Sequence, residues 1–412
     1  MTQSKKHHYV PQSLLRKFGY DDSKIYVYDK TRRVSFGSSI LDAGSENHFN
    51  TVFRDGERVN FEHVFQKNDA FLAELVQILT TGKCFNDLTD QYKDKLLGVI
   101  STQIFRTKMY RTSILSIAEQ LKFSLSEAGL PNEHLEAPSD NNIREIALSS
   151  YYKIQNDYTV LDRKVGFLIQ SNVDNDFIIS DNPVTKHNTF PYGDLGLSSS
   201  GVEIYFPLSP QLTFALYCPS IFEKMEVYVK TQAKSEVKDL YESILVGASS
   251  GHAVSLGEQT SKFLNTLQVK QSSRFLYSSD KSNFSIADLI LSESPELANV
   301  ESHTKVGKLG QAPEKNTRMP DGEWVVIHTD HDHFMLHVTG VFNDTKIFSF
   351  TTKSVEDTRL LLVLEPINEI SLYIDGQQTT YMRDVKLEVE PTYKECAKFK
   401  VLHTLDILNN IV

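Results

Sequence analysis

Two adjacent histidines near the start of the chain, His7 and His8, are the first residues whose types and spacing favour chemistry. Histidine can act as a general base, bind a metal ion or contact a phosphate group. A residue before proline is extended, so Val10 predicts a short strand in which His8 and Val10 share one side and His7 and Tyr9 the other. We predict that His8 is the site residue, because apolar neighbours and a hydrogen bond would position it. The alternative is that both histidines are solvated.

Gln103 and Arg106 interrupt an apolar run and are three residues apart, so they share one face of a predicted helix. A polar pair in such a place must be hydrogen-bonded or line a cleft. Arginine there would suit an anionic ligand such as phosphate. An internal ion pair explains the pattern equally well.

Asp181 and Asn182 follow an apolar strand and precede Pro183, so this strand ends in a carboxylate and an amide. Oxygen ligands of this kind hold divalent metal ions and also occur in catalytic sites. The alternative is an Asx turn, in which Asp181 bonds nearby backbone amides. On the sequence alone we favour the turn.

Composition and charge narrow the class of protein. The chain has 412 residues, 40% of them hydrophobic and 23% charged, and a net charge of −10, which is typical of globular proteins of two or three domains. Its three cysteines form no CxxC pair, so a zinc ribbon or a disulfide framework is not expected. No apolar run approaches the roughly 18 residues of a membrane span, and the polar start does not resemble a signal peptide. We expect a soluble cytoplasmic protein without membrane partners.

Hydrophobic periodicity predicts the elements that must position these residues. Residues 24–29 and 33–36 are expected to form a hairpin. Helices are expected from Asn60 to Gly82, from Thr89 through Ile104 and towards Leu125, and over 142–158, 234–245 and 258–271. Strands are expected over 165–169, 177–179, 202–206 and 212–217.

The rest of the chain is expected to be separate. Residues 281–320 are rich in serine, glutamate, lysine and glycine, which predicts a flexible link that is most mobile near 299–317. Residues 321–412 contain short strands at regular intervals, typical of a small β-rich domain. The expected fold is therefore α+β: a mixed core over 1–280, in which antiparallel strands clasp a helical middle, followed by a β-rich C-terminal appendage.

Five ordered motifs resemble the bacterial family called domain of unknown function 4238. They are the HHYVPQ stretch at 7–12 with Leu15, Arg16 and Phe18, the Q-x-x-R element at 103–106, the S-D-N-P strand end at 180–183, the P-L-S-P element at 207–210 and the L-N-x-x-Q helix at 264–268. The resemblance covers roughly residues 6–280. It implies a polar site, because residues of these types are rarely buried without a partner. Its expected members are His8, Gln12, Gln103, Arg106, Asp181, Asn182, Asn265 and Gln268.

Two functions are compatible with such a polar site. The resemblance implies that either function serves anti-phage defence, because members of the family occur among mobile-element-borne genes linked to it. In the first, the protein is a metal-dependent nuclease or phosphodiesterase acting on nucleic acid. His8 would activate water, Asp181 and His7 would hold Mg²⁺ or Mn²⁺, and Arg106 would neutralise the phosphate. The sequence lacks the asparagine and histidine spacing of an HNH nuclease.

In the second function, the polar set is a non-enzymatic pocket that recognises a phage component or an anionic ligand. Five of the eight expected members carry amide groups, which offer hydrogen-bond donors and acceptors without charge. Neither a glycine-rich phosphate loop nor a serine or cysteine nucleophile signature is present.

Overall fold

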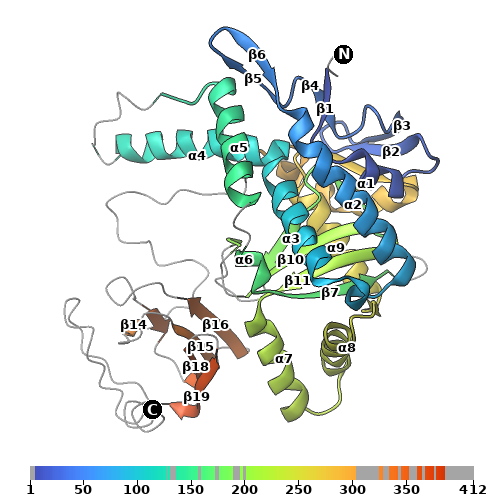
Figure 1. The fold of residues 1–412 in the computed structure, drawn as a ribbon. Coiled ribbons are helices and arrows are strands. Elements are labelled where there is room, and N and C mark those ends of the chain that lie inside the picture. The colour runs from blue at the N-terminus through green and yellow to red at the C-terminus, as the bar shows by residue number, and fades with distance from the viewer. Residues whose placement is uncertain are drawn as a thin grey trace. The chain divides into compact units, whose positions relative to one another are not determined.

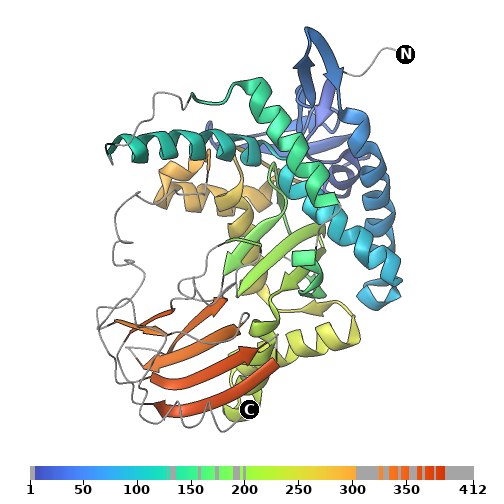
Figure 2. The same ribbon diagram turned by 60° about the vertical axis from the view of Figure 1, so that its left-hand side comes forward.

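The computed structural model describes residues 5–127, 129, 136–155, 159–171, 176–188, 195–197 and 201–302, and six strands between 324 and 385. The chain divides into two compact units. The first comprises Met1–His187 and Glu203–Gln311, and the second comprises Asn188–Val202 and Ala312–Val412. The fold is α+β, as expected from the sequence. Figures 1 and 2 show the elements from two directions.

The N-terminal part of the first unit is built from short strands around one short helix. Strand β1 (Lys6–His8) pairs antiparallel with β4 (Ser45–Asn47), and α1 (Gln12–Lys17) follows β1. The predicted hairpin is confirmed as β2 (Lys24–Asp29) and β3 (Val34–Ser39). A second hairpin, β5 (Thr51–Arg54) and β6 (Glu57–Asn60), was not predicted.

The middle of the first unit is helical. It contains α2 (Glu62–Gly82), η1 (Phe85–Asp87), α3 (Asp90–Phe105), α4 (Lys108–Glu127), α5 (Asp140–Gln155) and α6 (Thr159–Asp162). The helix predicted to continue past Arg106 is interrupted there. The Thr107 hydroxyl accepts a hydrogen bond from the Tyr110 N–H, so a new helix begins beyond the break.

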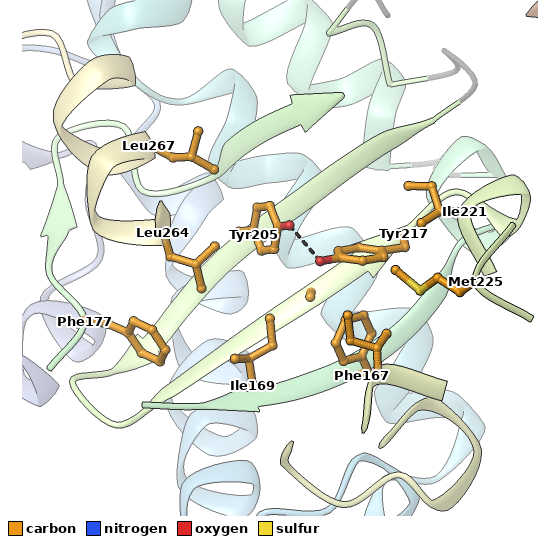
Figure 3. Packing of buried hydrophobic residues seen from close by; sticks show 11 residues of the cluster. Phe167, Ile169, Phe177, Tyr205, Tyr217, Ile221, Met225, Leu264 and Leu267 are labelled. Atoms are coloured by element: carbon orange, nitrogen blue, oxygen red, sulfur yellow. Dashed lines mark hydrogen bonds between the residues drawn. The ribbon is translucent and has the colours of Figure 1, made fainter. Parts of the chain in front are cut away.

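A five-stranded sheet follows, in the order β12-β7-β11-β10-β9. Its strands are β7 (Val165–Gln170), β9 (Thr185–Asn188), β10 (Val202–Ser209), β11 (Leu212–Tyr217) and β12 (Val254–Ser255). Helices α7 (Pro219–Thr231), α8 (Glu236–Ser250) and α9 (Glu258–Gln271) supply the rest of its core. Figure 3 shows this core, in which the buried hydroxyls of Tyr205 and Tyr217 are hydrogen-bonded at 2.8 Å.

A four-stranded sheet, in the order β3-β2-β13-β8, joins the N-terminal hairpin to later parts of the chain. It includes β8 (Ile179–Ser180) and β13 (Phe275–Ser278), and it is followed by η2 (Lys281–Phe284), α10 (Ser285–Glu293) and η3 (Pro295–Ala298). The expectation of a structureless link from residue 281 is therefore wrong for its first part. Helix α10 buries Ala287, Ile290 and Leu291 against Tyr28 and Leu276, so hydrophobic burial orders this stretch.

The second unit contains an antiparallel pair and a four-stranded antiparallel sheet. The pair is β14 (Trp324–Ile327) with β17 (Leu360–Val363), and the sheet has the order β16-β15-β18-β19. These four strands are β15 (Phe334–Val341), β16 (Thr345–Thr351), β18 (Ile367–Ile374) and β19 (Gln377–Val385). Most of the stretch expected to be mobile, 303–317, lies outside the described residues. Within the described part of the chain, no helix is both long and apolar enough to span a bilayer.

Candidate anion-binding site

A cavity of about 860 Å³ opens between β1, α1 and the start of α2. His8 and Gln12, two of the residues predicted from the sequence, line it. The other lining residues are Lys5, Lys6, Ser13, Arg16, Ser39, Leu41, Asp42, Glu62, Gln66 and Asp69. A cavity of this size fits a small organic ligand.

A chain of hydrogen bonds determines which ring nitrogen of His8 carries the proton. Arg16 Nη2 donates to Gln12 Oε1 at 3.1 Å, which turns the amide nitrogen of Gln12 towards His8 Nδ1, 3.4 Å away. Because Gln12 Nε2 can only donate, Nδ1 is the acceptor, and the proton of the neutral ring lies on Nε2. Nε2 is buried and has no hydrogen-bond partner within the described residues. The His8 ring lines the cavity, while Nε2 itself is enclosed by the fold near the Leu41 carbonyl.

The environment of His8 keeps its ring neutral. Burial lowers the pKa of His8 below its usual 6.5, and the charge of Arg106 acts in the same direction. The carboxylates of Glu62 and Asp69 and the carbonyl of Leu41 partly oppose this shift. At neutral pH the ring is an uncharged donor.

The carboxylates around the cavity are already paired within the fold. Asp42 forms an ion pair with Lys6, and Asp69 forms one with Arg106. Glu62 accepts the backbone N–H of His8 at 3.1 Å and a side-chain N–H of Asn50 at 2.6 Å. With these two ion pairs set aside, the cations of Lys5 and Arg16 face the single carboxylate of Glu62, so the cavity keeps an excess of one positive charge.

Two of the lining cations, Lys5 and Arg16, form no ion pair with any residue that the structure describes. They give the cavity a donor set suited to an anion, because charged donors bind phosphate and carboxylate oxygens strongly.

Gln103 and Arg106 lie beneath this site and hold the strand that carries His8. Arg106 donates to the His8 carbonyl and to both oxygens of Asp69, with the two shortest contacts at 2.5 Å. Gln103 Nε2 donates to the Tyr9 carbonyl at 2.8 Å. Both side chains are almost fully buried, at 1–2% exposed. Apart from Arg106 Nε, which has no hydrogen-bond partner within the described residues, these groups bond the fold, so the two side chains position the site and do not line the cavity.

His7 faces away from the cavity, as strand alternation predicts. It is fully buried, and its Nδ1 accepts the backbone N–H of Asn50 at 2.9 Å. The side chain of Asn50 in turn bonds Glu62 and Arg111. His7 therefore belongs to a buried network that shapes the loop after β4.

Asp181 lies apart from the cavity lining. Its two carboxylate oxygens accept three consecutive backbone N–H groups, those of Ser273, Arg274 and Phe275, each at 2.8 Å. Burial raises the pKa of Asp181, while these N–H groups and the charge of Lys30 oppose the shift. The prediction that Asp181 bonds backbone amides is therefore confirmed. However, the bonded amides are more than 90 residues away, so this is not a local Asx turn.

The amides expected in the same site serve the backbone instead. Asn265, Gln268 and Gln271 recur every three residues on α9 and bond the chain segment around β8. Asn265 bonds the Ile178 N–H and the Asp176 carbonyl, and Gln268 bonds the Ser180 hydroxyl and the Pro183 carbonyl. Gln271 bonds the N–H and the carbonyl of Lys186. Asn182 donates from its side chain to the Gln271 carbonyl.

We call this set of side chains on α9 the amide ladder. It satisfies backbone groups that have no neighbouring strand, so the predicted convergence of all eight polar residues on one site is wrong. Only His8 and Gln12 of the eight line the cavity.

The metal ligands proposed from the sequence, Asp181 and His7, bond different partners. The Asp181 oxygens bond amides at the start of β13, and His7 bonds Asn50. Among the described residues, no three histidine, cysteine or acidic side chains are grouped so that they could hold a metal ion.

The family model described as "Protein of unknown function (DUF4238)" matches residues 6–282. This is more than half of the chain. The chain belongs to the DUF4238 family. No curated protein and no solved structure matched it. The DUF4238 region contains the cavity lining except Lys5, the amide ladder and the four- and five-stranded sheets, so the motifs behind the resemblance include the framework of the site as well as its lining.

Ten of the twelve lining residues were not among the expected site residues, and three of them, Glu62, Gln66 and Asp69, follow a regular spacing. They are spaced four and three residues apart, so they lie on one face of α2. That polar spacing at the start of a predicted helix was a usable signal. The sequence could not show that this face of α2 lies beside His8, because the contacts join residues more than 50 positions apart.

The lowered pKa of His8 predicts a pH dependence of stability. Between pH 6.5 and the lower pKa of the folded state, His8 binds a proton more readily in the unfolded chain than in the folded chain. The free energy of unfolding should therefore decrease as the pH is lowered through this range. The His8→Gln variant should show a shallower decrease in urea titrations between about pH 5 and 6.5. Equal slopes for the two proteins would contradict the assigned pKa shift.

Proposed function

We propose that the His8 cavity binds a phosphate-bearing small molecule and that the protein acts by recognising it. The observation that carries this proposal is that Lys5 and Arg16, which form no ion pair within the described residues, line one cavity beside the Arg16–Gln12–His8 chain of hydrogen bonds. Cations beside neutral polar groups favour an anionic oxygen.

The dimensions of the cavity support a ligand larger than inorganic phosphate. Its volume is about 860 Å³, and Leu41, which is 58% exposed, offers apolar surface at the rim. Polar side chains from Ser13, Ser39 and Gln66 add hydrogen-bonding groups. A nucleotide combines an anionic end with a flat, partly apolar end, so nucleotides are the first class to test.

Isothermal titration calorimetry of the full chain without divalent metal should detect AMP or ATP and should not detect adenosine. His8→Gln and Arg16→Gln should each weaken binding at least about tenfold, a change typical of losing a buried donor or a charged contact. Lys17→Gln is the matched control, because Lys17 is the next residue of α1, bonds Gln77 and does not line the cavity. Failure of both AMP and ATP to bind, binding of adenosine as tight as that of AMP, or equal weakening by Lys17→Gln would refute the proposal.

We also propose a cellular role in anti-phage defence in the cytoplasm, which rests on the resemblance to a family with members among mobile-element-borne genes linked to such defence. A plating assay with phage on cells expressing the wild-type chain or His8→Gln tests it, and only the wild type should protect. The metal-dependent nuclease remains the less supported proposal, since the polar atoms of Asp181 and His7 are bonded within the fold. Cleavage of plasmid DNA or RNA with Mg²⁺ or Mn²⁺, lost in His8→Ala, would favour it.

A further inference from the structure

The two edges of the sheet β3-β2-β13-β8 differ in how their backbone groups are satisfied. At the β8 edge, the amide ladder of α9 bonds the backbone of the strand and its flanks. At the β3 edge, the strands described by the structure include β2 as its only neighbour. Unpaired strand edges are sites where another strand can add.

Two hydrogen bonds show which residues of β3 face outward. The Lys30 N–H donates to the Arg274 carbonyl across the pair of β2 and β13. Backbone groups alternate in direction along a strand, so every second residue of β2 counted back from Lys30, including Tyr28, bonds β13. The residues between them, including Val27, bond β3. Ile40 N–H bonds the Ser23 carbonyl, which gives the same alternation from the other end of the hairpin.

Because Val27 pairs with Phe36, the residues of β3 that bond β2 are Val34, Phe36 and Ser38. The N–H and C=O groups of Ser35 and Gly37 therefore point away from the sheet, and no hydrogen bond to them occurs within the described residues.

The β3 edge also lacks the features that usually prevent strand addition. Its sequence, VSFGSS, contains no charge and no proline, and Val34 and Phe36 are 47% and 43% exposed. Natural edge strands commonly carry lysine, proline or a bulge that blocks pairing. Here the register with β2 runs without a bulge.

We propose that the β3 edge pairs with the β3 edge of a second copy of this chain, antiparallel and related by a two-fold axis. The register that uses every outward group places Ser35 opposite Gly37 of the other copy, which forms four backbone hydrogen bonds. Phe36 then lies opposite its own copy in the closer, non-hydrogen-bonded position, where aromatic pairs are favourable. The two sheets become one continuous sheet of eight strands.

Charge complementarity supports a second copy as the occupant. The tip of the β2–β3 hairpin carries Arg32, which forms an ion pair with Asp29 and whose side chain is 73% exposed. The other end carries the exposed turn Asp21-Asp22 with the exposed Lys24, so it is acidic by one net charge. An antiparallel two-fold arrangement brings the basic tip of each hairpin towards the acidic end of its partner. One added strand buries less than the roughly 1,200 Å² of a standard interface, so the dimer should be weak.

Sedimentation equilibrium of the full chain tests this proposal. The wild type should dimerise with a Kd on the order of 100 µM. Phe36→Lys and Phe36→Glu should each be monomeric, because like charges would face each other across the two-fold axis, and an equimolar mixture of the two should recover the dimer. Ser35→Pro should also be monomeric while its thermal midpoint stays unchanged, because the N–H it removes points away from β2.

Phe53→Lys is the matched control, since Phe53 is a comparably exposed phenylalanine (48%) on the β5–β6 hairpin. It should dimerise as the wild type does. A wild type that stays monomeric up to about 1 mM, ten times the expected Kd, would overturn the proposal. Failure of the Lys and Glu variants to pair, or equal disruption by Phe53→Lys, would overturn it as well.

Discussion

The Asp181→Ala variant is expected to lose about 3–5 kcal/mol of unfolding free energy, the range found when a buried charged partner is removed. The carboxylate accepts the N–H groups of Ser273, Arg274 and Phe275, and alanine would leave all three without a partner. Hydrogen bonds to charged groups contribute about 1.5–3 kcal/mol each and are not additive. Urea unfolding of the full chain at neutral pH measures the loss.

Asp181→Asn should be destabilised less than Asp181→Ala, because an amide oxygen still accepts while the amide nitrogen cannot. Asp176→Ala is the matched control: this carboxylate precedes the same strand and accepts one exposed hydrogen bond from Gln211, so the loss should be below about 1 kcal/mol. If Asp181→Ala folded with wild-type stability and failed only in ligand binding, Asp181 would belong to the functional site after all.

Arg106→Ala is expected to cost a similar 3–5 kcal/mol, because its removal leaves the Asp69 carboxylate and the His8 carbonyl without their partner. The guanidinium also lies over the ring of Phe65, 4.7 Å from its centroid, so packing is lost as well. Arg106→Lys should restore less than half of the loss, since one ammonium group cannot reproduce the planar fork that reaches both acceptors.

The loss of the Arg106 contact should also affect ligand binding, because Arg106 holds strand β1. His8 projects from the strand that Arg106 holds by its carbonyl, so Arg106→Lys should also weaken nucleotide binding at temperatures where the variant is still folded. Arg54→Ala is the control, because Arg54 forms an exposed ion pair with Glu145 and such pairs contribute about 0–1 kcal/mol. An Arg106→Lys variant with wild-type stability and binding would show that this contact does not position His8.

Local pattern was sufficient for most individual elements. Helix α9 was predicted over the residues it occupies, and the β2–β3 hairpin and the central strands were predicted within a few residues. These succeeded because amphipathic periodicity reflects one buried face of each element. Helix α10 was missed because nine residues are too short for a clear period, and because its burial depends partly on β2, which lies more than 200 residues earlier.

The sequence by itself determined that the chain is α+β, that it belongs with one family of ordered motifs, and that polar residues of those motifs would need partners. It also determined that His8 and His7 point to opposite sides of a strand, since alternation is a local property of the backbone. Only the tertiary structure decided which partners those polar residues have. Asn265, Gln268 and Asp181 bond distant backbone groups, whereas His8 and Gln12 line a cavity. A buried amide or carboxylate needs a hydrogen bond whether a ligand or the chain supplies it, and that choice depends on contacts between remote segments.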